Sequence, residues 1–272
     1  MISLREAFDV GAFGGKAVQL GEALRAGLPV PDGVALSVAA VERVASGDQS
    51  AIEELADHLP SLEQPVAVRS SAVGEDSAGA SFAGQHATCL DVEPRLDAIV
   101  AAMRHVWESG RTDAALAYRR RMGIAGAPQV GIVVQRMVEP SVAGVLFSRD
   151  PVTGEDVRVI EAAWGLGEAV VAGLVTPDRF RLAHSGTVLE RCAGFKDVLI
   201  RRRRGGGTEE IAVAAERVEA LCLDDGQLVG LGRLAHRCET VFGGAQDLEW
   251  ALTGNDLVLL QRRPITVRGN EQ

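Results

Sequence analysis

A short apolar segment that delivers one arginine to a run of small residues is the strongest chemical signal in this sequence. Residues 66–69 read as a short buried strand with Arg69 at its carboxyl end, and the loop that follows from Ser70 is rich in Ser, Gly and Ala. Such a loop can place backbone N–H groups and hydroxyls against phosphate oxygens, while an arginine neutralises their charge. The segment therefore predicts a site for a nucleoside triphosphate.

A second phosphate signal comes from the lysines. Among 28 basic residues only Lys16 and Lys196 are lysines, and a compact ammonium resists replacement by arginine where it meets a phosphate at one point. Lys16 follows Gly14-Gly15 at the start of a helical pattern, where backbone N–H groups favour anions. The loop is not a Walker A motif, because Ala17 stands where Ser or Thr is needed. For Lys196 a nucleotide contact and a surface position both stay open.

The last two predicted strands form a hairpin whose register decides its chemistry. A two-residue loop places Glu249 and Gln261 on opposite faces, whereas a three-residue loop over 254–256 sets them across from one another, with Arg263 on the same face. Only the second register lets a carboxylate and an amide oxygen share a hard divalent cation beside an arginine. We therefore expect the three-residue loop; a plain edge hairpin with solvated polar residues is the alternative.

The elements that must position these residues mix helices and strands without strict alternation. Helices are predicted over 41–59, 96–107, 114–122 and 225–242, and the intervening apolar runs read as strands. This pattern favours α+β subdomains that flank a cleft. The run Arg201–Arg204 precedes three glycines and is interpreted as a flexible, solvated loop.

Composition restricts the class of protein. The 272 residues carry a formal net charge of −9, which disfavours a nucleic-acid surface. No apolar run reaches the roughly 18 residues of a membrane span, and Arg5, Glu6 and Asp9 argue against a signal peptide. Four scattered cysteines indicate free thiols in a reducing compartment. We predict a cytoplasmic protein.

Seven segments, in order along the chain, resemble one family. They are Gly14-Gly15-Lys16, Val68-Arg69-Ser70-Ser71, Ser81-Phe82-Ala83-Gly84-Gln85, Gln135-Arg136-Met137-Val138, Gly165-Leu166-Gly167-Glu168, Asp247-Leu248-Glu249-Trp250 and Gln261-Arg262-Arg263-Pro264. Together they resemble the N-terminal ATP-binding domain of the family of phosphoenolpyruvate synthase, pyruvate phosphate dikinase and rifampicin phosphotransferase. The resemblance implies an ATP-grasp fold, with subdomains 1–134 and 135–268 enclosing the nucleotide.

The resemblance also implies site residues. Lys16 and Arg69 would hold the phosphates, and Arg263 would stabilise the transferred phosphoryl oxygens. Glu249 and Gln261 would bind Mg²⁺. Gly84 and Thr88 would contact ATP from a loop that closes over it. Gln135, Met137 and Val138 would contact ATP from the link between the subdomains.

In such enzymes ATP delivers a pyrophosphoryl group to a histidine on a separate swivelling domain, and none of the five histidines here sits in a recognisable phosphohistidine motif. The first hypothesis is therefore the ATP-binding subunit of a split dikinase with a histidine-bearing partner. The alternatives are a self-sufficient ATP-dependent kinase or ligase, a non-catalytic nucleotide-binding module, and a domain excised from a larger enzyme. No residue of the sequence identifies the small-molecule acceptor.

Overall fold

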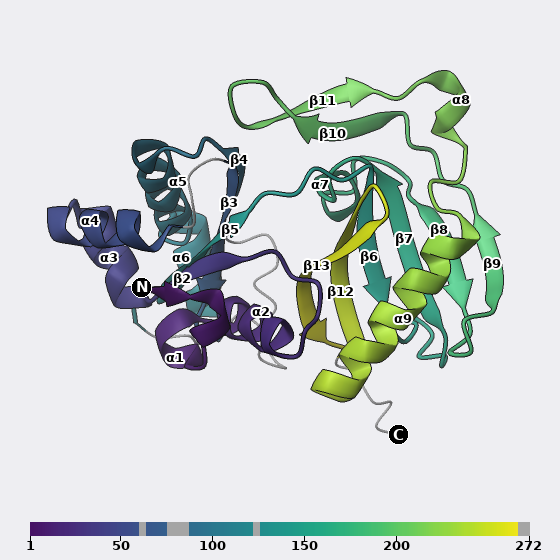
Figure 1. Ribbon diagram of the computed structural model, residues 1–272, viewed down its shortest axis with the longest axis horizontal. Helices are drawn as coiled ribbons and strands as arrows, with labels where there is room; N and C mark the ends of the chain where they lie inside the picture. The colour runs from purple at the N-terminus through teal and green to yellow at the C-terminus, as the bar shows by residue number, and fades with distance from the viewer. Residues whose placement is uncertain (60–63, 75–86, 122–125, 266–272) are drawn as a thin grey trace. The chain divides into compact units, whose positions relative to one another are not determined.

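The computed structural model describes residues 1–59, 64–74, 87–121 and 126–265, which fall into two compact units (Figure 1). Unit 1 comprises Met1–Arg25, Pro31–Met137 and Arg203–Gly207. Unit 2 comprises Ala26–Val30, Val138–Arg202 and Thr208–Gln272. Each unit is described by itself.

Unit 1 is built on an antiparallel sheet with the strand order β1-β2-β5-β3-β4. Its strands are β1 (Ile2–Ser3), β2 (Gly33–Leu36), β3 (Val66–Ala72), β4 (Thr88–Val92) and β5 (Val130–Arg136). Its helices are the 3₁₀ helix η1 (Leu4–Glu6), α1 (Val10–Phe13), α2 (Gly15–Arg25), α3 (Val38–Ser46), α4 (Gln49–His58), α5 (Leu96–Ser109) and α6 (Asp113–Arg121).

The two faces of this sheet differ in what covers them. Alternate residues of the strands, such as Val34, Val68 and Val134, pack with α3, α4 and α5 in one apolar core. Residues in between point to the other face, where α2 lies against β3 and β5. The Ala17 backbone N–H donates to Ser71 Oγ at 2.9 Å, which ties the first turn of α2 to β3. The second face thus receives the glycine loop and its lysine.

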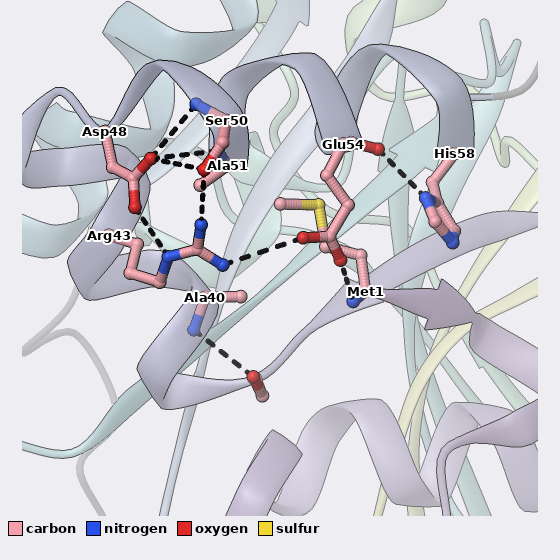
Figure 2. A network of polar contacts seen from close by, with 9 residues as sticks. Met1, Ala40, Arg43, Asp48, Ser50, Ala51, Glu54 and His58 are labelled. Atoms are coloured by element: carbon pink, nitrogen blue, oxygen red, sulfur yellow. Dashed lines mark hydrogen bonds and ion pairs between the residues drawn. The ribbon is translucent and has the colours of Figure 1, made fainter.

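The helix predicted over 41–59 is instead two helices, α3 and α4. Gly47 adopts the left-handed conformation (φ 86°) that commonly ends a helix, and the Asp48 side chain caps the next one by accepting from the Ser50 and Ala51 N–H groups. Figure 2 shows Arg43 at this corner, bonded to Asp48 at 2.7 Å and Ser50 at 2.8 Å. Arg43 also holds the pKa of the Asp48 carboxyl well below its ordinary value.

Unit 2 is built on a six-stranded antiparallel sheet with the order β13-β12-β6-β7-β8-β9. Its strands are β6 (Val142–Phe147), β7 (Arg158–Trp164), β8 (Asp178–Leu182), β9 (Val188–Cys192), β12 (Gln246–Thr253) and β13 (Asp256–Pro264). A separate hairpin pairs β10 (Val198–Arg202) with β11 (Thr208–Ala212). The helices are α7 (Glu168–Val171), α8 (Ala215–Val218) and α9 (Asp225–Phe242), the last with the predicted bounds.

The long helix α9 covers one face of this sheet. Leu248 and Trp250 are fully buried in β12, and the Arg262 guanidinium of β13 stacks on the Phe242 ring of α9 at 3.9 Å. Residues of β12 and β13 that alternate with these point to the opposite face. We call this the polar face of the hairpin, defined by Asp247, Glu249, Gln261 and Arg263.

The Arg201–Arg204 run is only in part the solvated loop that the sequence predicts: Arg203 and Arg204 lie in an exposed turn, whereas the first two residues are strand. Arg201 and Arg202 belong to β10, where Arg201 Nε donates to Glu209 at 2.8 Å and Arg202 bonds to Glu139 at 3.2 Å. Only the following residues form the turn, because the three glycines at 205–207 all adopt positive φ. The cross-strand Glu209 and the more distant Glu139 thus each pair with one arginine of the run.

Within the described ranges, no helix combines the length and the apolar character needed to cross a membrane.

Candidate nucleotide-binding site

Lys16 lies at the start of α2, whose first turn bonds to Ser71 near the end of β3. The residue is 92% buried by its neighbours, since only 8% of its surface is exposed. Gly14 (φ 79°) ends α1 and lets the chain turn into α2 directly against the Ser71 carbonyl. The sequence therefore folds locally into a short helix, a glycine turn and a helix N-terminus, which is an arrangement suited to anions.

Three further candidates share one face of the unit 1 sheet. Arg69 pairs directly with Thr88 of β4 and with Val133 of β5, and Gln135 lies two residues farther along β5. Side chains of directly opposed residues point to the same side, as do residues two apart. Arg69, Thr88 and Gln135 are thus on the face that α2 covers, together with Ser71. The structure groups these unit 1 candidates, and Gly84 lies outside the described residues.

The link predicted to contact ATP, at Gln135, Met137 and Val138, makes hydrogen bonds within unit 1. The buried Gln135 side chain donates through Nε2 to the Pro31 carbonyl at 2.8 Å. The Met137 N–H donates to the Pro65 carbonyl at 3.0 Å. These bonds fix the end of β5, so the side chain of Gln135 acts as a support for this link; Met137 and Val138 are half-buried.

Gly14→Ala tests the glycine turn. A Cβ at this position lies 1.8 Å from the Ser71 carbonyl oxygen, and the backbone has positive φ. We expect the substitution to destabilise the protein by at least about 2 kcal/mol and to weaken ATP binding, as measured by urea unfolding and calorimetry. Gly27→Ala is the control, because its φ of +71° is similar but nothing lies within 4 Å. Equal effects of both changes would contradict a role for close approach.

In unit 2 the structure sets Glu249 directly across from Gln261, as predicted, but by another route. Thr253 pairs with Asp256, so the loop has two residues and the predicted three-residue loop is wrong. A β-bulge beside Glu249 skips Leu260 and restores the pairing. One extra residue in a strand shifts every later side chain to the other face. The bulge therefore does what the longer loop was expected to do.

Asp247 is a functional candidate that the sequence reasoning left without a role. It pairs with Arg263 across the hairpin, and Arg263 Nε donates to Asp247 Oδ2 at 2.6 Å. Burial raises the pKa of the Asp247 carboxyl above its ordinary value, although Arg263 opposes this effect. Its spacing of two from Glu249 is a signal that places both on one face of a strand.

Two further charged residues of unit 2 are withdrawn from water, Glu168 in part and Lys196 completely. Glu168 opens α7, and burial raises the pKa of its carboxyl while a hydrogen bond with Thr208 lowers it. Lys196 is not on the surface: it is fully buried, with Nζ 2.5 Å from Asp178 Oδ1. Its retention as lysine reflects an internal ion pair.

The donor set of the hairpin fits a magnesium ion. Glu249 supplies a carboxylate and Gln261 an amide oxygen, both half-buried and directly opposed, and Mg²⁺ takes oxygen ligands from one or two carboxylates plus phosphates. Across the described part of the chain there is no group of three or more His, Cys, Asp or Glu side chains arranged to hold a metal. A magnesium ion held at this hairpin would take its remaining ligands from water and phosphate oxygens.

Unit 1 also contains a cavity of about 660 Å³. It is lined by α1, the first turn of α3, the end of β3 and the segment before β5. None of Lys16, Arg69, Thr88 or Gln135 lines it. The cavity is thus distinct from the face that carries the candidate phosphate ligands.

Comparison with known proteins places these residues in a class of nucleotide-binding domains. Residues 49–272 match the family described as "Pyruvate phosphate dikinase, AMP/ATP-binding domain", and the chain belongs to this family. The mixed helices and sheets of both units confirm the predicted α+β class, and membership agrees with the ATP-binding domain that the resemblance implies.

The curated relatives are longer proteins. A rifampicin phosphotransferase from Streptomyces sviceus is 43% identical over 205 residues, which cover 74% of this chain and 23% of the relative. A probable phosphoenolpyruvate synthase from Methanothermobacter thermautotrophicus is 33% identical over 96% of this chain and 45% of its own length. The solved structure of a D-alanine–D-alanine ligase from Helicobacter pylori aligns with 95% of this chain and 55% of its own at a TM-score of 0.44 and 10% identity. The chain thus spans less than half the length of these two curated relatives.

Proposed function

We propose that this chain binds Mg-ATP and activates it for transfer of a pyrophosphoryl group to a histidine of a phosphohistidine domain. The observation that carries the proposal is the hairpin register, which puts a carboxylate, an amide and an arginine on one face of unit 2. The Glu249–Gln261 pair offers a carboxylate and an amide oxygen to a hard cation, and Arg263 on the same face offers a positive charge to phosphate oxygens. Relatives named phosphoenolpyruvate synthase and rifampicin phosphotransferase support phosphoryl transfer.

In the proposed reaction, a histidine nitrogen attacks the β-phosphorus of ATP. The new N–P bond forms as the bond from the β-phosphorus to the oxygen shared with the α-phosphate breaks, and AMP leaves with that oxygen. Lys16 and Arg69 of unit 1 bind the phosphates and fix their position. Arg263 neutralises charge on the transferred oxygens, which is the kind of contribution that dominates phosphoryl transfer.

Glu249 and Gln261 would hold Mg²⁺, which when bound supplies charge neutralisation between phosphate oxygens. Thr88 on the Lys16 face and the link at Met137 and Val138 are proposed as further ATP contacts. Gly84 is proposed for the same role from the family motif alone. The acceptor histidine is supplied by a partner domain, and a self-sufficient kinase or ligase is the alternative.

The product of ATP turnover tests this proposal. The purified chain is incubated with Mg²⁺ and ATP, with and without millimolar imidazole as a free analogue of the histidine side chain, and nucleotides are separated. We expect AMP as the nucleotide product, formed slowly and accelerated by imidazole. ADP alone would indicate a simple kinase, and binding without any product would indicate a non-catalytic module; either result contradicts the proposal.

A further inference from the structure

The Asp247 carboxylate is mostly buried, although it lies on the polar face of the hairpin. Its side chain is 10% exposed, whereas that of its partner Arg263 is 43% exposed. Taking a carboxylate out of water costs free energy unless a partner and hydrogen bonds compensate for it. A stable hairpin does not need this arrangement, because an apolar residue fits a buried strand position at lower cost.

The two neighbouring arginines of β13 show what the carboxylate does. Arg262 points to the face covered by α9, where Phe242 receives its guanidinium. Arg263 points to the polar face, where its Nε donates to Asp247 Oδ2 at 2.6 Å. A guanidinium is planar, so a short bond at Nε together with the direct cross-strand pairing restricts the plane of the whole group.

We propose that Asp247 is a positioning residue that holds the guanidinium of Arg263 in the orientation required for phosphoryl transfer. The inference rests on the function proposed above. Arginine side chains lose considerable rotamer freedom when they are ordered, and a partner that orders the side chain beforehand removes this cost from the reaction step. Asp247 thus acts through Arg263 and makes no contact with the reacting atoms.

Asp247→Asn tests this role, because asparagine keeps the shape and an acceptor oxygen but removes the charge. We expect kcat for AMP formation to fall on the order of 10- to 100-fold, with KM for ATP within about threefold of the unchanged chain. We expect Asp247→Glu to recover part of the rate, because it restores the carboxylate. Thermal unfolding at pH 7.5 is expected to show no loss of stability, since the variant no longer buries a charge.

A double-mutant cycle with Arg263→Lys separates positioning from an independent role. If Asp247 acts through Arg263, adding Asp247→Asn to Arg263→Lys lowers kcat by less than about threefold, so the two effects are not additive. The matched control is Glu239→Gln, which removes a carboxylate bonded to Arg158 at 3.1 Å on the α9 side of the same unit. This control is expected to leave kcat unchanged.

The outcomes distinguish the two proposals. Absence of AMP formation by the unchanged chain, with or without imidazole, overturns the proposed function and with it the role of Asp247. Normal AMP formation by Asp247→Asn, additive effects in the cycle, or an effect confined to KM overturns the positioning role alone. If Asp247→Asn unfolds enough of the protein to account for the whole fall in kcat, Asp247 has a structural role, and the positioning role is overturned.

Discussion

Arg263→Ala is expected to lower the rate of AMP formation by on the order of 10³ or more, while the Kd for ATP changes by only a few-fold. The reason is that a cation on the transferred oxygens stabilises charge in the transition state, which ground-state binding does not require. Rates are measured in single turnovers with Mg-ATP and imidazole, and binding is measured by calorimetry.

The adjacent arginine supplies a matched control for this change. Arg262→Ala removes the same type of side chain from the next position of β13, but from the face on which Phe242 packs. We expect it to reduce thermal stability and to leave the turnover of the folded protein unchanged. Near-normal turnover by Arg263→Ala, or equal losses in both variants, would reject the catalytic role of Arg263.

Asp178→Ala is expected to destabilise the folded protein by about 3–5 kcal/mol, because it leaves a buried ammonium without its counter-ion. Both side chains of the Asp178–Lys196 pair are fully buried. Asp178 also accepts from the backbone N–H groups of Gly194 and Cys222, each at 2.7 Å. The substitution therefore leaves three buried donors without an acceptor. The loss of unfolding free energy is measured by urea unfolding.

A surface pair provides the comparison. Arg191 bonds to Asp225 at 2.6 Å, but the Asp225 side chain is 78% exposed. Asp225→Asn is expected to change stability by less than about 1 kcal/mol, because water screens exposed pairs. If Asp178→Ala proves no more destabilising than Asp225→Asn, the buried ion pair does not stabilise unit 2.

The family and the mixed α+β class follow from local sequence, because the motifs keep their order and spacing and the apolar periodicity marks the elements. The approximate bounds of α9 were predicted, and the structure shows local signals at both ends: Asp224 caps the first turn and Gly243 follows Phe242. The Glu249–Gln261 pairing was also predicted, because chemistry demands that both groups share one face.

Tertiary structure alone decided how that pairing is reached and which charged side chains are buried. A β-bulge depends on how β13 hydrogen-bonds to its partner, and no turn motif in the sequence reports it. The burial of Lys196 depends on Asp178, 18 residues earlier, being enclosed with it. Residue types along a chain determine which contacts are chemically possible, whereas the packing of distant segments determines which charged groups lose water and must find a partner.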